Sequence, residues 1–210
     1  MKLKKIASLA LAGIMAVSML AGCNGAASSG DDNGTTTTPV DNSFAASVNA
    51  EMNDKQKAIV TFESSAELTS AVNAIADKFN STELNVTITD WAKNPTLNKD
   101  FRDMLDADDD DGVSSDWEEN TSERTAADII IVPGKYTEEG LAKEVATFLG
   151  NKVVKNATMP NGYNATATNK LYKYTYTGDL AVTKVESLDG KVSAYVVGVV
   201  IEQTPTEIAK

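Results

Sequence analysis

The sequence predicts an α/β fold: a mostly parallel sheet from β-α-β-α-β-α units covered by helices, with a C-terminal antiparallel three-strand meander. Two observations lead to this prediction. In the first two thirds of the chain, strand-like segments alternate with segments whose apolar residues recur at helical spacing. In the last third, strand-like runs follow one another with only turn residues between them. No long linker interrupts residues 44–204, so we expect a single domain there and a short tail at residues 205–210.

Three strands are expected in the first part. Residues 57–63 (KAIVTFE) predict the first, and residues 84–90 alternate apolar and polar side chains, as half-buried strands do. In residues 128–132, a continuous apolar run comes after Asp128, and such a run is typical of a strand covered on both faces. Residues 43–53 fit a helix and a strand equally well.

Three helices are expected between and after these strands. Ser64 and Glu67 have the spacing of a capping box before a helix over residues 65–79. The pair Asn94-Pro95 predicts the start of the second helix, and Gly150 is placed to end the third. The apolar positions are Leu68, Val72, Ile75, Ala76 and Phe79, then Leu97, Phe101, Met104 and Leu105, and finally Leu141, Val145, Phe148 and Leu149.

The C-terminal meander is expected from three runs, residues 171–177, 180–187 and 191–202. Gly178-Asp179 would join the first two, and Asp189-Gly190 is a strong hairpin signal for the next pair. Alternation in the first run places three tyrosines on one face: Tyr172, Tyr174 and Tyr176. Such a row either packs over helices or stacks on a sugar or peptide, and we favour packing.

Composition excludes several kinds of chemistry. The 210 residues contain no His and one Cys. Catalytic systems that need imidazole, His-ligated zinc and multi-cysteine metal sites are therefore excluded. The net charge of −11 argues against nucleic acid as a partner, because phosphate backbones require clustered Lys and Arg.

In residues 1–23, a positively charged segment, an apolar segment and a small-residue segment follow one another as in a processing signal. Three lysines (Lys2, Lys4 and Lys5) precede the apolar segment Ile6–Leu20, which is short for a membrane span. The segment ends Leu20-Ala21-Gly22-Cys23, and here the chain resembles bacterial lipoproteins, whose lipobox has this form. The alternatives are an ordinary secretory peptide with an incidental Cys, and a short core helix.

This resemblance implies that residues 1–22 are a signal peptide and that Cys23 is acylated, with palmitate among its acyl chains, and becomes the first residue of the mature chain. Two or more acyl chains hold a protein stably in a bilayer. Residues 23–43 would then be the lipidated Cys and a flexible tether, because they are rich in Gly, Ser, Asp, Asn and Thr. An ordered N-terminal arm is the alternative.

Residues 57–134 more weakly resemble the first lobe of bacterial extracellular solute-binding proteins. The resemblance rests on Lys78-Phe79 at a helix end, on Val86-Thr87-Ile88 and on Asp128-Ile129. Those proteins hold ligand between two α/β lobes, and this chain has the length of one. The resemblance therefore implies a fold and no ligand-contacting residue.

An acidic segment, residues 107–118, resembles a degenerate calcium loop of the EF-hand kind. With Gly112 at loop position 6, the oxygen ligands fall on Asp109, Asp111, Ser115 and Glu118. Position 1 is Ala107, which offers no side-chain oxygen, so Asp106 or Asp108 would have to replace it. The alternative is a solvated acidic loop, and calcium is the only cofactor that we expect here.

The favoured function is a membrane-anchored lipoprotein of the bacterial cell envelope, on the outer side of the cytoplasmic membrane, with a non-catalytic binding or accessory role. Its partners would be the bilayer, through acylated Cys23, and an extracellular ligand, glycan or envelope protein. One alternative is an envelope hydrolase that uses the carboxylate pairs Asp108/Glu118 or Asp116/Glu119. Another is a calcium-stabilised structural or adhesive module. Trp91 and Trp117 are expected to be partly buried anchors beside the acidic segment.

Overall fold

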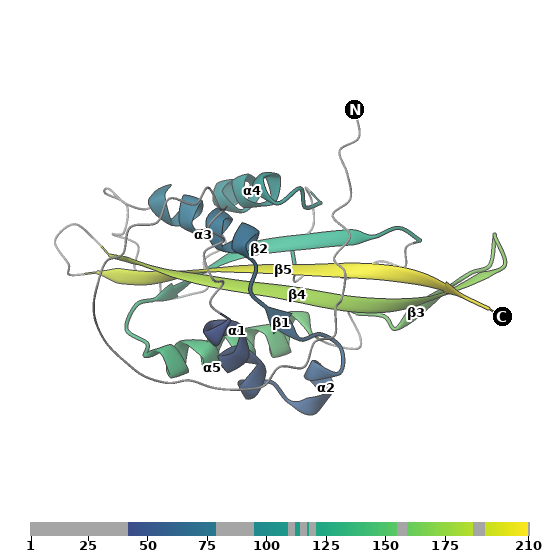
Figure 1. The fold of residues 1–210 in the computed structure, drawn as a ribbon, viewed down its shortest axis with the longest axis horizontal. Coiled ribbons are helices and arrows are strands. Elements are labelled where there is room, and N and C mark those ends of the chain that lie inside the picture. The colour runs from purple at the N-terminus through teal and green to yellow at the C-terminus, as the bar shows by residue number, and fades with distance from the viewer. Residues whose placement is uncertain are drawn as a thin grey trace, which may run out of the picture. The chain divides into compact units, whose positions relative to one another are not determined.

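Two long antiparallel strands, β4 (Lys170–Glu186) and β5 (Ser193–Ile208), run through the middle of the fold (Figure 1). The computed structural model describes residues 42–78, 95–108, 112–113, 117, 121–154, 159–186 and 192–209. The chain divides into two units, Met1–Thr37 and Thr38–Lys210, and all described residues lie in the second.

The described strands form a five-stranded mixed sheet with the order β1-β4-β5-β2. β1 (Phe62–Glu63) is parallel to β4, whereas β2 (Arg124–Pro133) is antiparallel to β5. β3 (Gly162–Ala165) pairs with the start of β4, also antiparallel. The α/β class is confirmed, but the prediction of a mostly parallel sheet is borne out only in part: β1 and β4 pair in parallel, whereas the other described pairings are antiparallel. A β-α-β unit gives parallel neighbours only when its strands pair directly, and here the β4–β5 hairpin lies between β1 and β2.

The predicted three-strand meander is a two-stranded ribbon. Gly178-Asp179 does not turn the chain, because β4 continues through it and pairs Gly178 with Ile201. A Cβ at residue 178 would lie 2.6 Å from ring carbons of Phe62, so this glycine permits the close approach of β1. β5 also continues to Ile208, so residues 205–208 belong to the sheet and not to a tail. The hairpin residues Asp189-Gly190 lie outside the described residues.

The first predicted strand, residues 57–63, is mostly not a strand. Helix α1 (Ser43–Glu51) settles the ambiguous segment, and α2 (Asp54–Lys57) follows it with a capping box between Asn53 and Gln56. Only Phe62 and Glu63 pair in the sheet. The backbone N–H groups of residues 57–60 instead donate to carbonyls of residues 53–56, which turns this segment away from the sheet. The Asn49 side chain bonds both the N–H and the C=O of Phe62, at 3.0 and 2.7 Å. The predicted strand at residues 84–90 lies outside the described residues.

The three predicted helices are present as α3 (Ala66–Lys78), α4 (Pro95–Met104) and α5 (Glu138–Phe148). The hydroxyl that caps α3 belongs to Ser65, which accepts from Leu68 N–H at 3.1 Å, while Ser64 donates to Leu180 O at 2.7 Å. Gly150 does not end α5, because a π-helical turn, η1 (Leu149–Val153), continues it. A Cβ at Gly150 would collide with the Gln56 amide, so close packing against α2 explains this glycine.

Helices cover both faces of the sheet. In Figure 1, α3 and α4 lie on one side of the long strands, and α1 and α5 lie on the other. Alternate residues of β5 serve the two faces: Val197, Val199 and Ile201 belong to the α1/α5 core, whereas Ala194 and Val196 belong to the α3/α4 core. This alternation is why β5 is apolar almost throughout its first half.

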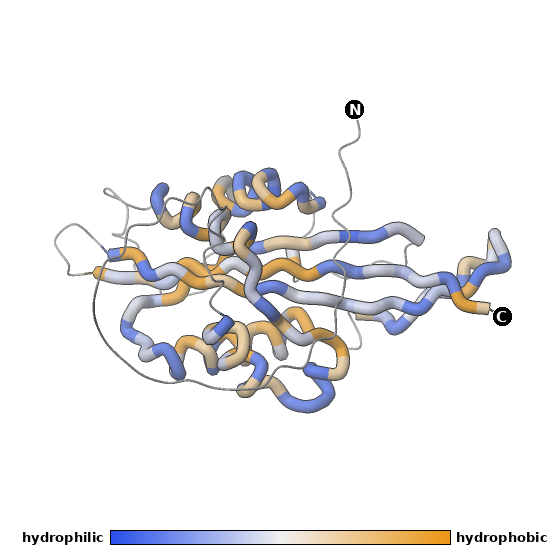
Figure 2. The backbone as a smooth tube through the Cα atoms, in the orientation of Figure 1, coloured by the Kyte–Doolittle hydropathy of each residue, from blue (hydrophilic) through white to orange (hydrophobic). Residues whose placement is uncertain are grey.

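The strands extend past the helices. In Figure 2 the strands are mostly orange where helices cover them and mostly white to blue in the stretch that leads to the C-terminal end. The strands of this stretch carry Thr175 and Thr177 in β4 and Thr204 and Thr206 in β5. No described helix is long and apolar enough to cross a bilayer.

Candidate functional site

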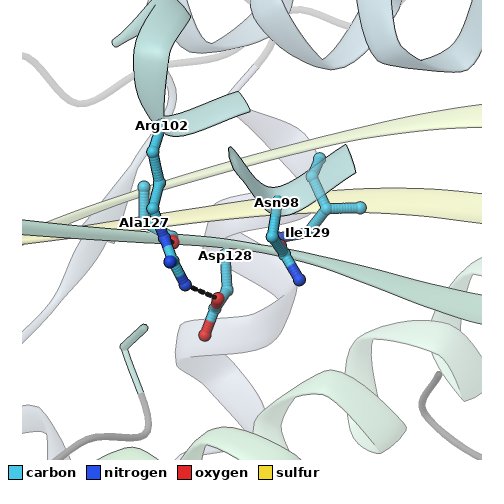
Figure 3. A network of polar contacts seen from close by, with 5 residues as sticks. All are labelled: Asn98, Arg102, Ala127, Asp128 and Ile129. Atoms are coloured by element: carbon cyan, nitrogen blue, oxygen red, sulfur yellow. Dashed lines mark hydrogen bonds and ion pairs between the residues drawn. The ribbon is translucent and has the colours of Figure 1, made fainter. Parts of the chain in front are cut away.

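Among the described strands, β2 lies at the edge of the sheet, where polar groups of α4 (Figure 3) and of the segment after α4 bond its backbone. Asn98 Oδ1 accepts from Ile129 N–H at 2.6 Å, and Arg102 Nε donates to Ala127 O at 2.8 Å. Asp108 bonds Thr125 twice: its own N–H donates to Thr125 O, and its carboxylate accepts from Thr125 N–H, both at 3.0 Å. In an antiparallel strand, alternate residues direct both backbone groups outward. These contacts therefore satisfy outward-facing groups that would otherwise pair with another strand.

A buried ion pair lies beside this edge. Arg102 Nη2 donates to Asp128 Oδ1 at 2.8 Å, and the side chains of Arg102 and Asp128 are 14% and 1% exposed (Figure 3). A Cβ on Gly112 would lie 2.6 Å from Asp128 Oδ2. Gly112 was predicted at the sharp turn of a calcium loop, and its close approach to the ion pair is a separate reason for a glycine here.

A second polar group, which we name the Trp117 cluster, consists of Trp117, Arg124, Tyr176 and Gln203. Arg124 pairs with Gln203, and Gln203 pairs with Tyr176, so the three side chains form a row across β2, β5 and β4. The Trp117 ring lies 4.9 Å from the Arg124 guanidinium carbon and packs edge-on against Tyr176 at 5.5 Å. Trp117, which was expected to be a partly buried anchor, is more completely buried than that, with 5% of its surface exposed.

The Tyr176 hydroxyl connects this cluster to the loop before β3. Gln203 Nε2 donates to it at 2.9 Å, and the hydroxyl donates to Pro160 O at 2.8 Å. Burial raises the pKa of Tyr176 to about 12, so the hydroxyl keeps its proton at neutral pH. Tyr174 on the same face is buried as well. The three tyrosines share one face of β4, and Tyr172 and Tyr176 are half-buried.

Carboxylates from separate segments meet on the opposite face. Glu63 pairs with Asp179 across β1 and β4, and Glu202 lies on the neighbouring strand, opposite Thr177. Burial, helped by the charges of Glu63 and Glu202 and opposed by a hydrogen bond from Ser65, raises the pKa of Asp179 to about 6. Burial and Glu123 raise the pKa of Glu202. The sequence does not reveal this group, because its members are far apart along the chain and each has ordinary neighbours.

Most of the predicted site residues lie outside the described part of the chain. These are Cys23, Trp91, Asp109, Asp111, Ser115, Asp116, Glu118 and Glu119. Asp106 is exposed with a positive φ of 50°, and Asp108 is bonded to Thr125. Within the described ranges, no three His, Cys, Asp or Glu side chains are grouped so that they could hold a metal ion. Calcium binding therefore stays a prediction.

Comparison with protein-family models, with curated proteins and with solved structures found no match to this chain. The description of its chemistry consequently rests on its own residues.

Replacing Arg102 by Met should lower the free energy of unfolding by about 3–5 kcal/mol, because it leaves the Asp128 carboxylate buried without its cation. Lys99→Met on the same helix is the matched control, because the Lys99–Asp103 pair is exposed and its loss should cost no more than about 0.5 kcal/mol. Chemical denaturation measures both. Equal losses in the two variants would contradict the assigned role of the ion pair.

Replacing Asp179 by Asn should raise the free energy of unfolding by about 1 kcal/mol at about pH 7, after allowance for solvent screening of a half-buried carboxyl. Above about pH 6 the native carboxyl is charged, and the full cost of burying that charge then lowers the stability of the wild-type chain. The wild-type chain should regain this stability as the pH falls from about 6 toward the ordinary carboxyl value of 3.8. The advantage of the variant should therefore vanish near pH 4.

The control for this pH dependence is Glu207→Gln, which removes an exposed carboxylate paired with Lys170. Its effect should stay within about 0.5 kcal/mol. Denaturation curves recorded across the pH range measure these effects. The assignment would be contradicted if the difference in the free energy of unfolding between Asp179→Asn and wild type did not change with pH.

Proposed function

We propose that this chain is a lipoprotein of the bacterial cell envelope, anchored through acylated Cys23, and that its folded unit has a non-catalytic binding or accessory role. The observation that carries the proposal is the leader, in which three lysines, an apolar segment and Leu20-Ala21-Gly22-Cys23 occur in the order of a lipoprotein signal. The lone Cys of the sequence is the one that the lipobox requires.

The contacts of the described polar groups support a non-catalytic role. Arg102 and Asp128 are paired inside the fold, and Asp108 closes the edge of β2. The Tyr176 hydroxyl is bonded to Gln203 and Pro160. A catalytic acid, base or nucleophile needs access to its substrate, whereas these groups are occupied by the protein itself. Asp108, one of the acids predicted for a hydrolase, thus has a structural contact with the backbone of Thr125.

The polar stretch of β4 and β5 supports a binding role. On the α3/α4 face, Thr175 pairs with Thr204 and Thr177 pairs with Glu202, so hydroxyls and a carboxylate form a flat row of hydrogen-bonding groups. Thr175 and Thr177 are exposed. A rigid sheet face of this kind presents donors and acceptors at fixed spacing, and it suits a hydrogen-bonding partner such as a glycan or a polar protein surface.

The anchor is tested by replacing Cys23 with Ala in the full chain, expressed in a bacterium with its leader intact. The wild-type protein should partition into the detergent phase, and mass spectrometry should show an acylated N-terminal Cys23. Because the acyl chains supply the membrane affinity, the fraction of the variant found in the detergent phase should be at least about tenfold lower than that of wild type.

Asn24→Ala, next to the lipobox but outside it, is the control and should partition like wild type. An unmodified Cys23 in the membrane fraction would defeat the proposal. So would detergent partitioning of Cys23→Ala at the wild-type level.

A further inference from the structure

The Trp117 cluster contains a buried hydrogen-bond donor and a buried acceptor that are not bonded to each other. Trp117 Nε1 and Gln203 Oε1 are buried and have no hydrogen-bond partner among the described residues. Their residues are 5% and 0% exposed, so bulk solvent does not reach them. Leaving a buried donor or acceptor unsatisfied is costly, and native structures rarely do so.

The sheet register and the ring contacts place the side chains of Trp117 and Gln203 in one neighbourhood. Arg124, Gln203 and Tyr176 are direct neighbours on three adjacent strands. Trp117 contacts the two outer members of this row, at 4.9 Å and 5.5 Å. Adjacent strands are about 4.8 Å apart, so a ring that touches both outer side chains must lie across the middle one, Gln203.

The chemistry of the two atoms defines what fits between them. An indole N–H only donates and an amide oxygen only accepts, so neither Arg124 nor a metal cation satisfies both. The Gln203 amide nitrogen and the Tyr176 hydroxyl are already bonded to each other. A single partner for both atoms has to accept one hydrogen bond and donate another, as a small neutral molecule such as water does.

We propose that the Trp117 cluster is a binding site for one buried water molecule, which accepts from Trp117 Nε1–H and donates to Gln203 Oε1. Buried waters of this kind commonly make two to four hydrogen bonds and form part of the fold. The water links Trp117, in the acidic segment, to the central strand β5. It thereby adds a directional contact to an anchor that otherwise consists of ring contacts.

The test uses the full chain in detergent micelles with ¹⁵N-labelled tryptophan. Because the sequence has two tryptophans, Trp91→Phe leaves Trp117 as the single indole signal. We expect a cross-peak between the indole N–H and a long-lived water, and slow exchange of that N–H. A sharp indole signal from folded protein without the water cross-peak would overturn the proposal.

Two variants separate the water from the neighbouring hydrogen bond. Tyr176→Phe and Gln203→Met both remove the Gln203–Tyr176 bond, but only Gln203→Met removes the oxygen that holds the water. The cross-peak should therefore persist in Tyr176→Phe and disappear in Gln203→Met. Its persistence in both variants would show that Gln203 does not bind the water and would overturn the proposal.

If either variant fails to fold, a crystal structure of the unaltered chain at a resolution that shows ordered water decides the question. Density for one water within hydrogen-bond distance of both atoms supports the proposal. A direct bond between Trp117 Nε1 and Gln203 Oε1, or a dry cluster, refutes it.

Discussion

The pairing of β4 with β5 is the interaction on which the rest of the structure depends. It runs without interruption from Leu171–Ile208 to Glu186–Ser193. β1 and β2 add to the two sides of this ribbon, and each face carries one pair of helices. Because its side chains alternate between the two faces of the sheet, β5 contributes to both cores.

The buried polar groups serve this architecture. Among the described strands β2 lies at the edge of the sheet, and the side chains of Asn98 and Arg102 together with residue 108 bond its outward-facing backbone groups. The Arg102–Asp128 pair then fixes α4 against that edge. On the α1/α5 face, Trp117 contacts Arg124 and Tyr176. Within the described part of the chain, the uncovered polar stretch of the sheet remains available for function, beside the lipid anchor that we propose at Cys23.

Local sequence patterns predicted the helices well, but they could not predict the directions of the strands. α3, α4 and α5 follow from apolar spacing that any short window contains. The order of the strands depends on which distant segments pair, and nothing near β1 shows that it adds to β4. The glycine at 178 shows the same limit, because close approach to Phe62 and a turn both require glycine. Local sequence could not distinguish these two causes.

The candidate site was predictable only in part. Trp117 and the shared face of Tyr172, Tyr174 and Tyr176 followed from residue type and alternation. No role for Gln203 was predicted from the sequence. Alternation does indicate one, because Gln203 continues the inward-facing positions Val197, Val199 and Ile201 and is polar. The Arg102–Asp128 pair had no such signal, since its members come from different elements and neither sequence neighbourhood shows the other.

Hydrogen exchange of the backbone amides tests most directly whether β5 is the centre of the fold. Residues 194–203 of β5 pair with β4 on one side and with β2 on the other, whereas residues 204–208 pair with β4 alone. The amides of residues 194–203 should therefore exchange more slowly than those of residues 204–208 and of every described helix, with protection that approaches the free energy of global unfolding. If residues 194–203 exchanged as fast as residues 204–208, the central position of β5 would be contradicted.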